Sequence, residues 1–133
     1  MKRLLILLML VSQPVWAGWV KLSEVGSGTE TAYTSYFDPA TVRKTPNGRR
    51  VWGLKSFAQP QQGSRGTYQS EKLLYEFDCN GERLRVLQWT EYSDPTGDGE
   101  MRGTRNDPEQ WIVVYPGSIG ETRLKAACSV PLK

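Results

Sequence analysis

The residues that could perform chemistry in this chain are two cysteines and a set of carboxylates, because its 133 residues include no histidine. Histidine is the commonest general base and a common zinc ligand, so its absence excludes Ser-His-Asp catalysis, Cys-His catalysis and histidine-based zinc sites. Cys79 and Cys128 lack the Cys-x-x-Cys spacing of a redox pair. We expect them to form one structural disulfide, which closes a loop of about 50 residues.

The carboxylates offer two further kinds of chemistry. Glu76 and Asp78 could in principle act as the acid–base pair of a hydrolase, but Arg85 and Arg83 stand in position to pair with them. The segment Asp94–Glu100 resembles the start of a calcium-binding loop, yet an arginine stands where such a loop needs a bidentate glutamate. We therefore expect a polar loop there, and a protein that is not an enzyme and binds neither metal nor cofactor.

An exported protein is indicated by the first 17 residues. Lys2 and Arg3 precede an apolar run, and Pro14–Ala17 has the small-residue exit of a cleavable signal peptide. The apolar run is too short to span a bilayer as a helix, and no second such run follows. We expect a leader at residues 1–17, one domain at residues 18–133, and a periplasmic or secreted product. No cysteine near the cleavage region is available for lipid attachment, and no stable membrane insertion is expected after cleavage.

The net charge of the exported part is small. The leader holds two of the 17 basic residues and none of the 14 acidic ones, so residues 18–133 carry a formal charge of +1. A nucleic-acid partner is therefore not expected.

A β-hairpin is the best-determined element. Asn80-Gly81 separates two alternating runs, Leu73–Cys79 and Glu82–Trp89, and this dipeptide is a strong signal for a two-residue hairpin turn. In the register that such a turn imposes, Phe77 faces Leu84 and Tyr75 faces Val86, so apolar residues share one face. Glu76 and Asp78 then meet arginines on the other face.

The same register predicts a candidate protein-binding face. It places Arg83, Arg85 and Trp89 together on the face opposite Cys79. An exposed patch of arginine and tryptophan is typical of protein-binding surfaces. The alternative is that a strand or loop covers this face. Either this face or an unpaired sheet edge would permit two copies of the chain to pair.

The remaining patterns predict an α+β fold. Ser118 and Glu121 form a capping box before a helix at Ile119–Ser129, although one more strand at Arg123–Val130 is the rival interpretation. Asp38-Pro39 starts a short helical turn. Gln59–Thr67 and Ser93–Glu109 are expected to be loops. The expected architecture is an antiparallel β-sheet of about five to six strands, with one C-terminal helix packed on one face and tethered by the disulfide. Besides the hairpin, strands are predicted at Trp19–Val25, Thr31–Phe37, Arg50–Phe57 and Trp111–Tyr115.

Several short motifs follow one another in an order typical of a known family. They are Tyr36–Val42, Trp52–Phe57, Ser70–Lys72, Glu76–Cys79, Arg83–Arg85, Tyr92-Ser93 with Gly97 and Gly99, and the closing Cys128. Together they resemble the surface-adhesin protein E-like family over about Trp19 to Cys128. The resemblance implies an antiparallel sheet with a disulfide-tethered C-terminal helix, and attachment to host or surface macromolecules.

Two functional hypotheses follow from these observations. The first is a non-enzymatic binding module of the cell envelope, which binds a protein or a cell-surface macromolecule as the resemblance implies. The second is a soluble periplasmic accessory or inhibitor protein that binds an endogenous or secreted protein.

Overall fold

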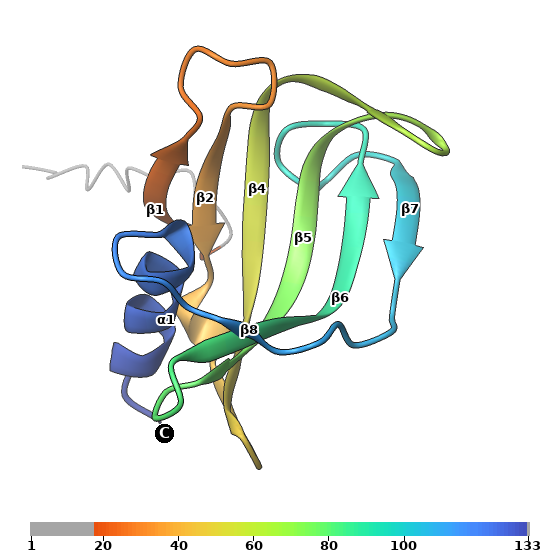
Figure 1. Cartoon of the computed structure of the whole chain (residues 1–133). Coiled ribbons are helices and arrows are strands. Elements are labelled where there is room, and N and C mark those ends of the chain that lie inside the picture. Colours follow the sequence, from red (N-terminus) through yellow and green to blue (C-terminus); the bar gives the residue numbers. More distant parts are fainter. Residues whose placement is uncertain (1–17, 133) are drawn as a thin grey trace, which may run out of the picture.

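The computed structural model describes residues 18–132, which form an antiparallel β-sheet and one C-terminal helix (Figure 1). The predicted leader lies outside the described residues. The main path of the sheet runs β1-β2-β4-β5-β6-β7, while β3 pairs with β4 and β8 pairs with β6. The elements are β1 (Val20–Val25), β2 (Tyr33–Phe37), η1 (Pro39–Thr41), β3 (Arg43–Thr45), β4 (Gly48–Gly63), β5 (Gly66–Asp78), β6 (Arg83–Tyr92), β7 (Met101–Arg105), β8 (Ile112–Val113) and α1 (Ile119–Ser129).

The α+β class and the C-terminal helix are confirmed, and the described sheet has eight strands rather than five to six. The expected loop Gln59–Thr67 is wrong, because β4 and β5 continue through it. Two contacts hold these strand ends. Across the strands, the rings of Phe57 and Tyr68 lie 5.8 Å apart, and the amide of Gln61 donates to the carbonyl oxygen of Glu30, in the loop between β1 and β2, at 2.8 Å. Such contacts override the weak strand propensity of a Gln- and Gly-rich segment.

The expected loop Ser93–Glu109 is also wrong in part, because it contains β7. This strand pairs with the edge of β6 that faces away from β5, and the hydroxyls of Thr90 and Thr104 lie 3.0 Å apart across the pair. Conversely, the strand predicted at Trp111–Tyr115 is reduced to the two residues of β8.

The β5–β6 hairpin has the predicted register near its turn. Phe77 pairs with Leu84 and Glu76 with Arg85, as expected. The turn itself differs, because four residues separate the strands and the positive φ of 50° belongs to Glu82. The carboxylate of Asp78 organises this wider turn by accepting from the backbone N–H of Gly81 at 2.8 Å.

We call the sheet face on which α1 packs the inner face. Alternate residues of β5 (Leu73, Tyr75 and Phe77) point to this face and form the main core with Leu124 and Ala127 of α1. The hydroxyl of Ser118 accepts from the backbone N–H of Glu121 at 3.2 Å, which caps the helix as predicted. The rival strand at Arg123–Val130 is excluded.

We call the opposite face of the sheet the outer face. On this face β4 and β5 form a smaller core with Leu54 and Leu74, which are 4% and 5% exposed. The loop after β6 folds over it, and Gly97 approaches so closely that a Cβ there would lie 2.5 Å from Lys72 and 3.4 Å from Leu54. A loop therefore covers part of the outer face. The part next to the β5–β6 turn, which carries Arg83 and Arg85, is left as the candidate binding region.

Candidate binding surface

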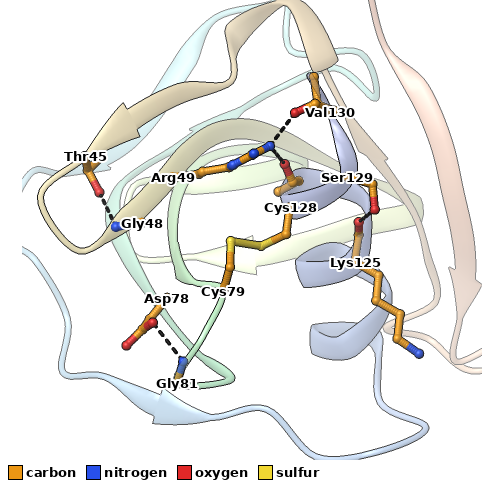
Figure 2. Close-up of a disulfide and its surroundings, with 11 residues drawn as sticks. Thr45, Gly48, Arg49, Asp78, Cys79, Gly81, Lys125, Cys128, Ser129 and Val130 are labelled. Carbon is orange, nitrogen blue, oxygen red and sulfur yellow. Dashed lines mark hydrogen bonds between the residues drawn. A yellow bond between two sulfur atoms is a disulfide. The ribbon is translucent and has the colours of Figure 1, made fainter. Parts of the chain in front are cut away.

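The disulfide Cys79–Cys128 is confirmed, and it joins the β5–β6 turn to the last turn of α1 (Figure 2). The two Cα atoms are 6.0 Å apart across 49 residues of sequence. Arg49 of β4 reinforces the same junction, because its guanidinium donates to the carbonyl oxygens of Ala127, at 3.0 Å, and Val130. Positive charge at the C-terminal end of a helix also complements the helix dipole. The end of the hairpin that carries Arg83 and Arg85 is thus held in place from the inner side.

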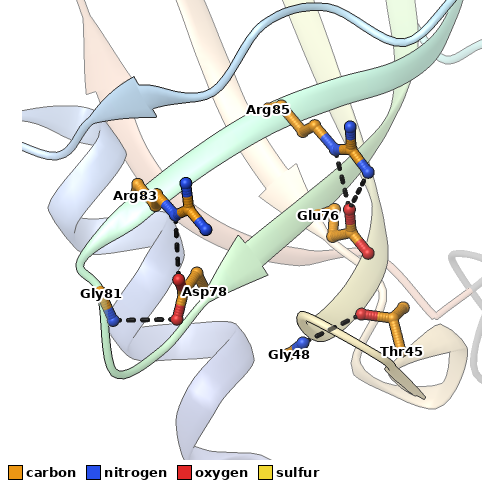
Figure 3. Close-up of polar contacts among 7 residues, drawn as sticks. All are labelled: Thr45, Gly48, Glu76, Asp78, Gly81, Arg83 and Arg85. Carbon is orange, nitrogen blue, oxygen red and sulfur yellow. Dashed lines mark hydrogen bonds and ion pairs between the residues drawn. The ribbon is translucent and has the colours of Figure 1, made fainter.

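Two ion pairs lie side by side on the outer face of this hairpin (Figure 3). The Arg83 side chain lies 2.9 Å from a carboxylate oxygen of Asp78, and that of Arg85 lies 2.7 Å from a carboxylate oxygen of Glu76. Arg83 and the Gly81 N–H lower the pKa of Asp78, with the backbone hydrogen bond as the larger cause. Glu76 is only 4% exposed, so its carboxylate is committed to this pair. Both acids are structural ion-pair partners, as their sequence positions indicated.

Trp111 completes this surface. It follows β7 in the chain, and its ring lies 4.6 Å from the guanidinium carbon of Arg83 and 4.6 Å from that of Arg85. Cation–π contacts of this kind attract the two guanidinium groups to the face of the indole. The loop that carries Trp111 is anchored by the backbone hydrogen bond from Glu109 to Val86, at 2.8 Å. We call Arg83, Arg85 and Trp111 the Arg–Trp surface.

The prediction that Trp89 shares the face of Arg83 and Arg85 is wrong. The register of β5 and β6 shifts by one residue between the pairs Tyr75–Val86 and Leu74–Gln88, which marks a β-bulge. One extra residue on a strand turns every later side chain to the opposite face. Trp89 consequently lies opposite Leu73 and packs against the main core on the inner face.

The sequence therefore identified two of the three residues of the Arg–Trp surface. Trp111 was missed because the sequence placed it in a separate strand, Trp111–Tyr115, and no periodicity says where that strand lies relative to the hairpin. One signal in the sequence could have found it. Arg83 and Arg85 alternate on a strand and so place two cations on one face, and an aromatic ring such as that of Trp111 can stack on such cations.

A second group of polar residues lies on the inner face, around a hollow between β4, β5 and β6. A shallow hollow of about 320 Å³ has Leu73, Val86 and Trp89 on its walls. Lys55 and Glu71 lie 3.9 Å apart at its rim. Burial raises the pKa of Glu71, and the charge of Lys55 opposes this effect. Among the described residues, no group of three or more Cys, Asp or Glu side chains is placed to hold a metal ion.

The acidic loop that resembles a calcium site organises itself with its own donors. The Asp94 carboxylate accepts from the Thr96 hydroxyl at 2.6 Å and from the backbone N–H groups of Thr96, Asp98 and Gly99. Burial opposes ionisation, but these hydrogen bonds outweigh it and lower the pKa of Asp94 to about 2. The carboxylate therefore serves as an internal cap that shapes the loop over the outer face.

Comparison with known proteins places the fold in a family. A family model described as Surface-adhesin protein E matches residues 19–129. The chain belongs to the surface-adhesin protein E family. Membership supports a surface-adhesin-like role, favours a non-enzymatic one and suggests a surface or secreted location. No curated protein matches the sequence.

Solved structures of Haemophilus influenzae protein E share this family fold. The crystal form II structure has a TM-score of 0.63 at 11% identity and covers 85% of this chain and 88% of its own. The selenomethionine form gives 0.64 at 11% identity, with 85% and 87% covered. The structure from a non-typeable strain gives 0.59 at 10% identity, with 84% and 76% covered. At such low identity these likenesses establish the shared fold alone. Within residues 18–132, no helix has the length and hydropathy needed to cross a membrane.

Proposed function

We propose that this protein is an exported, non-enzymatic adhesin-like module that binds a protein or another macromolecule at the cell surface through the Arg–Trp surface. Family membership supports the adhesin-like role, and the observation that carries the choice of site is the placement of Trp111 against both Arg83 and Arg85. Tryptophan and arginine are the residues most enriched at the energetic centres of protein interfaces.

The geometry supports binding in two ways. The arginines are held by Asp78 and Glu76, so little side-chain freedom remains to be lost when a partner binds. The Arg83 side chain is only partly covered, with 44% of its surface exposed, and it can therefore still donate to a partner. Just beside it, Val113 of β8 pairs with Arg83 and is 64% exposed, which adds apolar area to the surface.

Binding assays with site variants test the proposal. Purified protein spanning Gly18–Lys133 is immobilised and exposed to a panel of extracellular-matrix proteins and to intact host cells. For any ligand that binds, we expect Trp111→Ala and Arg83→Ala each to raise Kd by tenfold or more, since hot-spot truncations cost about 2 kcal/mol or more. Tyr115→Ala is the matched control, because Tyr115 is a 70% exposed aromatic residue outside the Arg–Trp surface.

The result that would contradict the proposed site is equal affinity of Trp111→Ala, Arg83→Ala and the unaltered protein. Protease treatment of intact cells tests the location separately. Cleavage on intact cells supports surface display. Protected protein in the periplasmic extract would instead favour the periplasmic accessory hypothesis, and an endogenous envelope protein would then be the expected partner.

A further inference from the structure

The β3–β4 hairpin concentrates positive charge at one end of the sheet. Arg43 lies directly opposite Arg50, and Lys44 lies directly opposite Arg49. Residues 39–70 contain six basic residues and no acidic one. Like charges directly across two strands are destabilising, so the pairing of β3 with β4 does not account for this arrangement.

The internal contacts of Arg43, Lys44 and Arg49 leave their charge uncompensated. Arg43 donates to the carbonyl oxygens of Ala40 and Val42, both at 2.8 Å, and Arg49 donates to two carbonyls at the end of α1. Carbonyl oxygens satisfy the donors without cancelling the cations. Arg43 and Lys44 are exposed, and neither has an ion pair with any residue in the 18–132 range. Arg50 differs, because it lies opposite Glu76 in the β4–β5 ladder.

A largely apolar hollow lies beside this charge. Its volume is about 430 Å³, and it is formed between η1, β3 and the segment that follows α1. Val42 and Val130 contribute to its lining, and Leu132 is 43% exposed at its edge. Arg43 and Lys44 also line it, so cations and apolar side chains share one surface. Arg83, Arg85 and Trp111 do not line the hollow, which is therefore distinct from the Arg–Trp surface.

We propose that this end of the molecule docks on an anionic lipid surface. Arg43 and Lys44, which both line the hollow, would contact headgroup phosphates, while Leu132 and the apolar lining of the hollow would contact the acyl chains next to the headgroups. Basic residues next to exposed apolar side chains are what peripheral attachment to anionic bilayers requires. A soluble polyanion would satisfy the cations but leave the apolar hollow without a partner, which is why we commit to lipid. Such docking would hold the domain at a membrane surface by its folded part alone.

Vesicle co-sedimentation tests this inference. Protein spanning Gly18–Lys133 is mixed with vesicles of phosphatidylcholine alone, or of phosphatidylcholine and phosphatidylglycerol in equal amounts. We expect binding only to the anionic vesicles and a decrease with added salt. Since each basic residue contributes about 1 kcal/mol at an anionic surface, Lys44→Glu is expected to lower the partition coefficient at least about fivefold.

Arg65→Glu is the matched control, because it makes the same change of charge at the exposed turn between β4 and β5, at the far end of β4. We expect this variant to bind as the unaltered protein does. Equal binding to neutral and anionic vesicles, or equal losses in the Lys44 and Arg65 variants, would overturn the proposal. A folding defect is not expected for Lys44→Glu, because it replaces a repulsive pair with Arg49 by an attractive one.

Leu132→Ser separates lipid from soluble polyanions. On an anionic bilayer this variant should bind more weakly, whereas its binding to dextran sulfate should not change. If dextran sulfate binding depends on Lys44 while Leu132→Ser leaves vesicle binding intact, the site recognises charge alone and the lipid proposal fails.

Discussion

Leu73 of β5 lies directly opposite Trp89 of β6; Leu73 belongs to the main core of the inner face, and the half-buried Trp89 packs against it. The β-bulge between this pair and the turn of the hairpin separates Trp89 from Arg83 and Arg85. The two tryptophans near this hairpin consequently have different roles. Trp89 contributes to the core, whereas Trp111 lies against two arginines on the outer face.

Alanine at each tryptophan should therefore give different losses of stability. Trp89→Ala is expected to lower the free energy of unfolding by about 2–4 kcal/mol, because it leaves a cavity beside Leu73. Trp111→Ala should cost about 1–2 kcal/mol, the sum of two cation–π contacts. Urea unfolding followed by circular dichroism measures both. A larger loss for Trp111 than for Trp89 would contradict the assignment of the faces.

The disulfide should be a main source of stability. Replacing Cys79 and Cys128 together by serine is expected to lower the free energy of unfolding by about 2–4 kcal/mol, because the unfolded chain regains the freedom of a 49-residue loop. Adding reductant to the unaltered protein should produce a similar loss and should leave the double variant unchanged. A loss of less than about 0.5 kcal/mol would show that Arg49 and the core hold α1 without the bridge.

Arg49→Met tests the polar part of the same junction. The methionine keeps much of the apolar stem but leaves the carbonyl oxygens of Ala127 and Val130 without their donor. Hydrogen bonds from a charged donor contribute about 1.5–3 kcal/mol, so a loss in this range is expected in thermal or urea unfolding. Arg50→Met is the control, since the neighbouring Arg50 makes no such contact with α1 among the described residues, and it should change stability little.

Glu91 should give stability an unusual dependence on pH. Its side chain lies opposite Glu71 in the β5–β6 ladder and is 8% exposed, with Gly63 and Gly103 leaving room for its carboxylate. Burial, and then the charge of Glu71, raise the pKa of Glu91 above 4.5. Ionising this group in the folded state is therefore unfavourable, and the cost appears as pH rises through the raised pKa.

Glu91→Gln should remove that cost. The variant is expected to be about 0.2–1 kcal/mol more stable than the unaltered protein at pH 7, since a like-charge cross-strand pair is lost. The difference should shrink as pH falls through the raised pKa and then the ordinary value of 4.5, and should vanish near about pH 3, where the carboxyl group is protonated in both folded and unfolded states. Urea unfolding across this pH range measures it, with the exposed Glu30→Gln as control. A difference that is constant with pH would show that Glu91 acts by packing and not by charge.

Patterns within short stretches of the sequence determined the elements that depend on contacts between residues close in the chain. The capping box at Ser118 placed α1, Asp38-Pro39 placed η1, and alternation around the β5–β6 turn gave the register of four residue pairs. Each of these depends on neighbours within a few residues, so the amino-acid types alone carry the information. The disulfide and the α+β class followed from the same local patterns together with the absence of any other cysteine.

Only the tertiary structure decided how distant segments complete the surfaces. The bulge in β6 turns Trp89 to the core. Pairing with the edge of β6 gives the polar segment Met101–Arg105 its strand conformation. The connection after β7 brings Trp111 to Arg83 and Arg85. The basic end of the β3–β4 hairpin acquired its apolar hollow from residues that follow α1. These features depend on contacts between segments far apart in the sequence, where small differences in packing outweigh local propensity.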